Sequence, residues 1–210
     1  MIINNLHHIT TSPEAAALAC QGGVRWVQLR VKNVPYPTWK QLALDTQQVC
    51  RQYGATLLIN DNPQLALEIG ADGVHLGKQD MAPAEARKLL GPGFIIGGTA
   101  NTFADMEGLI AAGIDYIGLG PFRFTTTKEK LSPILGLAGY ADIFAQYRAA
   151  GFTTPVIGIG GVGLADVAAL LATGLHGVAV SGAIGGTTNP AATAALFTEE
   201  LSKPLTLATL

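Results

Sequence analysis

The sequence has few cysteines, little excess charge and no long uninterrupted apolar run, and each shortage narrows what the chain can be. Cys20 and Cys50 are the only cysteines among 210 residues. They lie in helix-like stretches without metal-ligand spacing, so we expect plain buried or half-buried thiols. A formal net charge of −2 argues against a surface for nucleic acid or anionic membranes. Asp166, His176 and several glycines interrupt the apolar stretch 164–184, which argues against a membrane-spanning helix.

Two further features are missing from the sequence. The first five residues carry neither a basic segment nor a long apolar one, so we expect no secretion signal and a cytoplasmic location. No Ser/His/Asp or Cys/His arrangement stands out, which argues against acyl transfer by a protein nucleophile. Whether the chain forms a homo-oligomer is left open by the sequence.

Apolar residues are abundant for a chain of this size. The hydrophobic content is 49% and the mean hydropathy is +0.33. A parallel sheet that is covered on both faces explains these values, because its strands are apolar on both sides. The length suits one domain over 1–210, with a core over about 5–202 and a frayed C-terminal tail.

Short apolar segments alternate with helix signals along the chain. Strands are expected at 6–9, 24–29, 56–59, 73–76, 94–98, 116–119, 156–159 and 177–180. Helices are expected between them, among others at 39–53 and 164–173. Helix signals include Ser12 before Pro13 at the start of one segment and Gly113 after the end of another. Eight βα units are the number that closes a parallel α/β barrel, so we expect a (β/α)8 TIM barrel rather than an open doubly wound sheet, which usually has fewer strands.

The residues that follow the expected strands are unusually polar. In parallel strands these ends meet on one face, where α/β enzymes place their chemistry. After the seventh strand come Gly160 and Gly161, and after the eighth come Ser181 and Gly182. Barrels frequently bind phosphate with these two loops through backbone N–H groups, so we interpret the four residues as a phosphate cradle. The alternative is that the glycines only make tight turns.

Two carboxylates follow other strands on the same face. Asp61 comes after the third expected strand and Asp80 after the fourth. Carboxylates that converge from adjacent strands can hold Mg²⁺, which keeps water and phosphate oxygens as its other ligands. Because Pro63 and Pro83 follow closely, the alternative is that both carboxylates cap helices.

Cations accompany the carboxylates. Arg30 and Lys32 share one face of the second strand's end with Gln28, and Lys128 lies on the long connection 121–135. Cations and a metal at one barrel mouth suggest a clamp for a diphosphate leaving group. The alternative is an internal salt bridge to a carboxylate. His75 lies within the fourth strand, where a histidine is more often structural than catalytic.

Taken in order, these motifs resemble the thiamine phosphate synthase family over roughly residues 5–200. The resemblance rests on residues 28–32, 60–61, 70–77, 80, 120–121, 125–128, 160–161 and 177–184. It implies a (β/α)8 barrel that joins a hydroxymethylpyrimidine diphosphate to a thiazole phosphate, or to its carboxylated form, to give thiamine phosphate and pyrophosphate. It also implies a dissociative reaction through a pyrimidinylmethyl cation, which needs no protein nucleophile.

The resemblance implies a role for each matching position. Asp61 and Asp80 would hold Mg²⁺. The diphosphate would be contacted by Arg30, Lys32, Asn60, Thr99 and Lys128, and Gln28 would lie near the pyrimidine. The thiazole phosphate would be held by Thr125, Thr127, Gly161, Ser181 and Gly182. His75 is a further candidate for binding substrate.

The chain departs from the family pattern at a few positions. Thr99 stands where serine is common, and Phe124 stands where we expect proline. The pair Ala100-Asn101 stands where the family often has Thr-His, and Ser181-Gly182 stands where the family has a hydrophobic residue followed by serine. Two rival functions follow from the same fold: a thiazole tautomerase, which needs only the thiazole-phosphate site, and a non-catalytic protein that binds a phosphorylated ligand.

Overall fold

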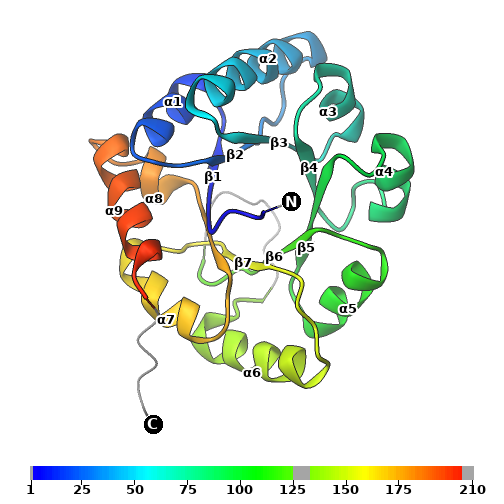
Figure 1. Ribbon diagram of the computed structural model, residues 1–210, viewed down its shortest axis with the longest axis vertical. Helices are drawn as coiled ribbons and strands as arrows, with labels where there is room; N and C mark the ends of the chain where they lie inside the picture. The colour runs from blue at the N-terminus through cyan, green and yellow to red at the C-terminus, as the bar shows by residue number, and fades with distance from the viewer. Residues whose placement is uncertain (1, 125–132, 205–210) are drawn as a thin grey trace.

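Eight parallel strands close into a barrel in which each strand pairs with the next and β8 pairs with β1. The computed structural model describes residues 2–124 and 133–204. Helices surround the barrel on the outside (Figure 1). The strands are β1 (Leu6–Thr10), β2 (Trp26–Leu29), β3 (Thr56–Asn60), β4 (Gly73–Leu76), β5 (Ile95–Ala100), β6 (Tyr116–Leu119), β7 (Val156–Ile159) and β8 (Gly177–Val180). The expected (β/α)8 barrel is confirmed.

The helices follow the expected alternation with three differences. They are α1 (Pro13–Gln21), α2 (Tyr36–Tyr53), α3 (Pro63–Ile69), α4 (Pro83–Leu90), α5 (Phe103–Ala111), α6 (Gly136–Ala149), α7 (Val167–Ala172), α8 (Gly182–Gly185) and α9 (Pro190–Ser202). The helix α2 starts earlier than its apolar pattern indicates. The segment expected to form one helix over 164–173 is split into the 3-10 turn Leu164–Asp166 and α7. The helix α8 has four residues, too few to show a helical period in sequence.

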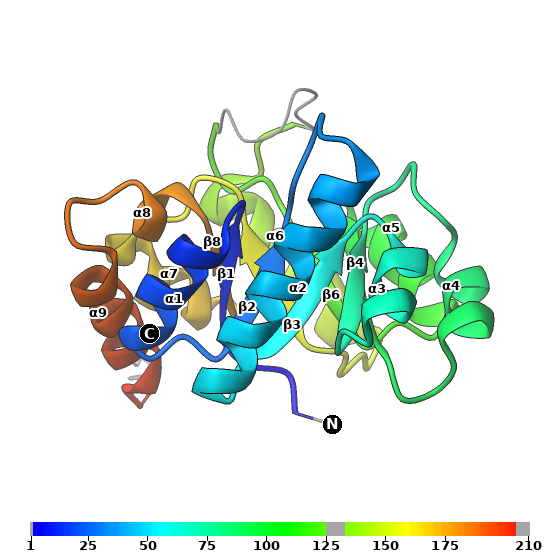
Figure 2. The same ribbon diagram turned by 90° about the horizontal axis from the view of Figure 1, so that it is seen from above.

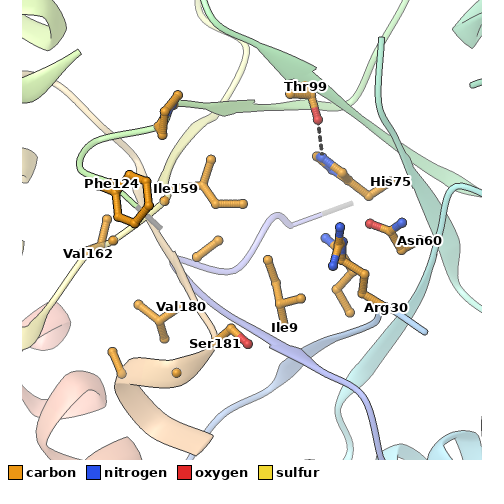
Figure 3. Close-up of a pocket in the computed structure, with 18 of the residues that line it drawn as sticks. Ile9, Arg30, Asn60, His75, Thr99, Phe124, Ile159, Val162, Val180 and Ser181 are labelled. Atoms are coloured by element: carbon orange, nitrogen blue, oxygen red, sulfur yellow. Dashed lines mark hydrogen bonds between the residues drawn. The ribbon is translucent and has the colours of Figure 1, made fainter. Parts of the chain in front are cut away.

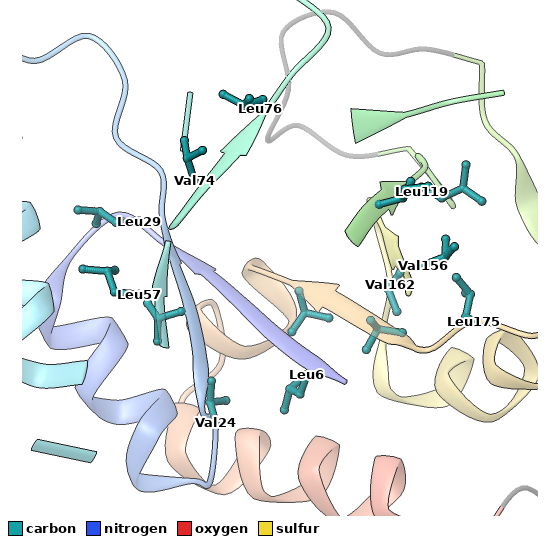
Figure 4. Packing of buried hydrophobic residues seen from close by; sticks show 14 of the residues in the cluster. Leu6, Val24, Leu29, Leu57, Val74, Leu76, Leu119, Val156, Val162 and Leu175 are labelled. Carbon is teal, nitrogen blue, oxygen red and sulfur yellow. The ribbon is translucent and has the colours of Figure 1, made fainter. Parts of the chain in front are cut away.

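The core consists of two shells separated by the strands. Successive residues of a strand point to opposite faces, so Leu57 and Ile59 pack outward against the helices while Leu58 packs inside the barrel. The outer shell between strands and helices is mainly aliphatic (Figure 4), and aromatic side chains such as Tyr140, Phe144 and Phe197 complete it. Inside the barrel, Trp26 and Tyr116 are the largest side chains, at about 1% exposure each. The barrel is therefore packed and not a pore.

The carboxyl ends of the strands lie at one end of the barrel, opposite the end at which the N-terminal segment enters (Figure 2). The long connection after β6 is attached to the loop after β7: Phe122 N donates to Ile159 O at 2.9 Å and Arg123 N donates to Gly160 O at 2.8 Å. Thr125, Thr127 and Lys128 lie outside the described residues. In the part of the chain that the structure describes, no helix is long and apolar enough to cross a membrane.

Candidate active site

A cavity of about 420 Å³ opens at the carboxyl ends of the strands. Gln28, Asn60 and His75 reach it from β2, β3 and β4, because the parallel register places all three on the inner face of the barrel. Eight of the predicted substrate and catalytic residues line it: Gln28, Arg30, Asn60, His75, Thr99, Gly161, Ser181 and Gly182. The barrel thus gathers side chains that are separated by up to about 150 positions in sequence.

One side of the cavity is polar. Arg30, Asn60 and His75 lie together there, and Thr99 stands above the histidine ring (Figure 3). His75 Nε2 lies 3.1 Å from Thr99 Oγ1, and His75 Nδ1 lies 2.8 Å from the hydroxyl of Tyr116 below. Both ring nitrogens are therefore engaged. This side presents a guanidinium, an amide and a hydroxyl, a set suited to anionic oxygens.

The other side of the cavity is formed by backbone and apolar groups. Phe124, Ile159 and Val162 lie across from Arg30 (Figure 3). Gly161 has a φ of +73°, a conformation that L side chains rarely adopt, and it lines the cavity together with Ser181 and Gly182. Phe124, where the sequence suggested a proline, exposes 68% of its surface at this rim. The expected phosphate cradle thus faces the polar side across the cavity.

Lys32, Asp61 and Asp80 line a second hollow of about 450 Å³ instead of the main cavity. Lys32 Nζ forms an ion pair with Asp61 Oδ2. The internal salt bridge considered from sequence is therefore present for this pair. Asp80 accepts a hydrogen bond from Gly77 N at 2.6 Å. Two of the three residues adjoin the main cavity through their neighbours in the chain: Asp61 directly follows Asn60, and Lys32 lies two residues after Arg30.

Helix capping does not account for the two carboxylates. The N-cap of α3 is Asn62, whose side chain accepts from Leu65 N at 2.9 Å, and the N-cap of α4 is Ala82, which makes no side-chain capping bond. Asp61 instead adopts a φ of +66°, a costly conformation for a residue other than glycine. Strained backbone of this kind concentrates at functional sites. The capping alternative is therefore wrong.

The two carboxylates influence one another. Burial raises the pKa of Asp80 above its usual value, and a hydrogen bond with Asp61 raises it further, while Gly77 N–H and Lys32 act in the opposite direction. A bound cation relieves repulsion between neighbouring carboxylates and favours their charged forms. Among the described residues, no cluster of three or more His, Cys, Asp or Glu side chains is placed to hold a metal. Two carboxylates suit an ion that takes its other ligands from water and phosphate, as Mg²⁺ does.

Comparison with known proteins identifies the family. The family model described as thiamine monophosphate synthase matches residues 1–184. The chain belongs to this family. It is 52% identical over 171 residues to the thiamine-phosphate synthase of Phocaeicola vulgatus, covering 81% of this chain and 82% of that one. It is 49% identical over 179 residues to that of Bacteroides thetaiotaomicron, covering 85% and 86%.

A solved structure of the same family agrees. The thiamine phosphate pyrophosphorylase from Pyrococcus furiosus superposes with a TM-score of 0.83 at 27% identity, covering 94% of this chain and 95% of that one. The family's barrel therefore extends over nearly the whole chain.

Sequence reasoning missed several residues around the cavity. Asn101 lines it and donates from Nδ2 to Gly120 O, and Ile9 and Ile159 form apolar parts of its wall. Phe124 and Asn101 were noted from the sequence only as departures from the family pattern. Tyr116 lies beneath the cavity and contacts His75. The period-two alternation of β1 and β7 carried the signal for the two isoleucines, whereas nothing in the sequence indicated the partner of Tyr116.

Proposed function

We propose that this chain is a thiamine-phosphate synthase, which transfers the pyrimidinylmethyl group of hydroxymethylpyrimidine diphosphate to a thiazole phosphate and releases pyrophosphate. Family membership and relatives of that name at about 50% identity support the activity. The observation that carries the proposal is the two-sided cavity, in which Arg30, Asn60 and Thr99 face the loops that carry Gly161 and Ser181. Two phosphorylated substrates fit such an arrangement, with the reacting ends between them.

The chemistry that we propose is a dissociative substitution. The bond between the pyrimidine methylene carbon and the diphosphate oxygen breaks, and both electrons leave with the oxygen. The thiazole nitrogen then supplies its lone pair to the cationic carbon, which forms the new C–N bond. No protein nucleophile takes part. The chain's contribution is to hold both reactants in line and to stabilise charge on the departing diphosphate.

Specific side chains would provide that stabilisation. Arg30 presents a guanidinium on the polar side of the cavity, where a bidentate contact with phosphate oxygens is favourable. Asn60 and Thr99 add an amide and a hydroxyl donor. Lys128, which lies outside the described residues, is proposed to supply a further cation at the leaving oxygens. Gln28, at the base of the same side, is proposed to contact the pyrimidine.

The residues present also fit a magnesium ion. Asp61 and Asp80 would hold it, because their carboxylates interact with one another beside the polar side of the cavity. When bound, the ion supplies positive charge that neutralises the diphosphate oxygens. Lys32 forms an ion pair with Asp61 in the structure, and we propose that it exchanges this partner for the diphosphate when the substrate binds. The carboxylated thiazole is a second acceptor to test in place of the plain one.

The direct test is incubation of the purified chain with both substrates and Mg²⁺, followed by detection of thiamine phosphate by mass. Omission of either substrate is the first control. Arg30→Met should lower kcat/KM for the diphosphate by on the order of a hundredfold, the usual cost of one transition-state donor. Arg51→Met, at an exposed position of α2, is the matched control and should not change it. A failure to form thiamine phosphate would contradict the proposal.

The same preparation separates the rival functions. A tautomerase would bind and isomerise the thiazole phosphate without the diphosphate, and a non-catalytic protein would bind it without turnover. Calorimetry with thiazole phosphate, in the presence and absence of the pyrimidine diphosphate and Mg²⁺, distinguishes both from a synthase.

A further inference from the structure

A buried tyrosine lies directly beneath the polar side of the cavity. Tyr116 belongs to β6 and is 1% exposed, and its hydroxyl lies 2.8 Å from His75 Nδ1. The other ring nitrogen of His75 lies 3.1 Å from Thr99 Oγ1, and both His75 and Thr99 line the cavity. A continuous chain of hydrogen bonds therefore runs from the barrel interior to the substrate site.

Two glycines on neighbouring strands make room for this chain. A Cβ at Gly97 would lie 2.2 Å from the Tyr116 ring, and a Cβ at Gly118 would lie 3.0 Å from the His75 ring. The first contact is closer than real Cβ atoms essentially ever come to a neighbour, and the second is tighter than nearly all real Cβ contacts. The rings of Tyr116 and His75 consequently occupy space that a residue larger than glycine at position 97 or 118 would fill.

The neighbours of Tyr116 determine the direction in which its proton points. Burial raises the pKa of Tyr116 far above its usual range, so the hydroxyl keeps its proton, and Trp26 and Gln28 offset part of this rise. Within the described residues, Trp26 Nε1 makes no hydrogen bond, so the indole does not fix the orientation of the Tyr116 hydroxyl.

Among the residues that the structure describes, the hydrogen bond that the Tyr116 hydroxyl makes is the one with His75 Nδ1. A buried O–H group that pointed elsewhere would be left without an acceptor, so the hydroxyl donates its proton to His75 Nδ1. The neutral imidazole then carries its proton on Nε2 and donates it to Thr99 Oγ1. Since that oxygen accepts from His75, the Thr99 hydroxyl directs its proton elsewhere, and the cavity lies on its open side.

We propose that Tyr116 is a positioning residue: by donating to His75 Nδ1 it fixes the Nε2–H tautomer and turns the Thr99 hydroxyl into a donor that faces an anionic oxygen in the cavity. This inference rests on the proposed function, in which that oxygen belongs to the diphosphate. The reverse direction would point a Thr99 lone pair at the anion and lose the hydrogen bond. The direction of these hydrogen bonds therefore matters for binding an anion, in addition to the packing that the three side chains provide.

The first test reads the tautomer directly in the unliganded protein by ¹⁵N NMR of the histidine rings, with His75→Gln to assign the signals. We expect neutral His75 with its proton on Nε2. In Tyr116→Phe, Nδ1 loses the hydroxyl that donates to it, so its ¹⁵N signal should move to the value of a ring nitrogen that accepts no hydrogen bond. Tyr147→Phe is the matched control, because it also removes one hydroxyl that is buried and bonded, to Thr154 O at 2.5 Å, far from the cavity. It should leave the His75 signals unchanged.

The second test is kinetic. Tyr116→Phe should lower kcat/KM for the diphosphate about tenfold, in line with the loss of one ordered hydrogen bond, and leave KM for thiazole phosphate nearly unchanged. Thr99→Val should have a similar effect, and Thr99→Ser should restore wild-type values. A proton on Nδ1 in the wild type, or a Tyr116→Phe variant with wild-type NMR signals and kinetics, overturns the proposal. The NMR result does not depend on turnover, so failure of the proposed function would be recognised separately.

Discussion

A single methyl group at Gly161 should separate phosphate binding from general stability. Gly161 has a φ of +73°, and a Cβ there would lie 2.9 Å from Arg123 Cβ and 3.0 Å from Phe124 O. Relief of the closer contact needs a shift of about 0.5 Å, since ordinary contacts begin at 3.4 Å. The alanine side chain therefore imposes backbone strain and also displaces the chain at the rim of the cavity.

Two matched glycines isolate these effects. Gly54 ends α2 at a φ of +61° with no atom within 4 Å of a Cβ, so Gly54→Ala imposes strain alone. Gly182 lines the cavity with an ordinary φ and no atom within 4 Å, so Gly182→Ala adds a methyl group at the phosphate loop without strain. The left-handed conformation costs an L residue roughly 1–2 kcal/mol. We expect Gly161→Ala and Gly54→Ala to lose about that much unfolding free energy.

The kinetic outcome should differ from the stability outcome. Gly161→Ala should raise KM for thiazole phosphate by on the order of tenfold, because small displacements of positioning groups cost large factors in rate and binding. Gly54→Ala should change this KM by no more than about twofold, a change that corresponds to well under 1 kcal/mol. Gly182→Ala should raise the KM without a loss of stability, because its methyl group enters the cradle without backbone strain. Steady-state assays with each substrate varied, together with urea denaturation, measure both quantities. The reasoning is refuted if Gly161→Ala keeps the wild-type KM, or if both substrates are affected equally.

Three further predictions concern the metal, the leaving group and the response to acid. Asp61→Asn and Asp80→Asn should abolish most Mg²⁺-dependent turnover without lowering the melting temperature. Asparagine is chosen because it tolerates the local backbone better than alanine does. Rates near that of the wild type would contradict the metal assignment. Lys128→Ala should lower kcat about a hundredfold and change thiazole-phosphate affinity little, whereas a kcat within about threefold of wild type would falsify its role. Burial lowers the pKa of His8 from 6.5 to about 4, so the unfolded chain binds a proton in this range that the folded chain does not, and stability falls as the pH falls below 6.5. In the wild type, this proton uptake should lower the unfolding free energy by about 2 kcal/mol between pH 8 and pH 5. His8→Phe should not show this part of the decrease when its unfolding free energy is measured by urea denaturation at both pH values. A pH profile parallel to that of the wild type would contradict the assignment.

The carboxylates and the phosphate loops illustrate how far the sequence could lead. The position of Asp61 after a strand was readable, but its capping role could be dismissed only when Asn62 was seen to cap α3. A residue before a helix has the same sequence signature whether it caps the helix or not. Similarly, Gly161 suggested a close approach to phosphate, and only the structure showed that Arg123 and Phe124 lie against it.

The sequence by itself determined the barrel and the end at which the chemistry lies. Eight apolar segments that alternate with capped helices close in one way, and polar residues after parallel strands must meet at one face. The tertiary structure alone decided which interior side chains touch. His75 and Tyr116 are 41 positions apart and meet because the registers of β4, β5 and β6 place them on one level inside the barrel, in the space that Gly97 and Gly118 leave. Registers between separate strands depend on closure of the whole barrel, so no local pattern in the sequence can specify such a contact.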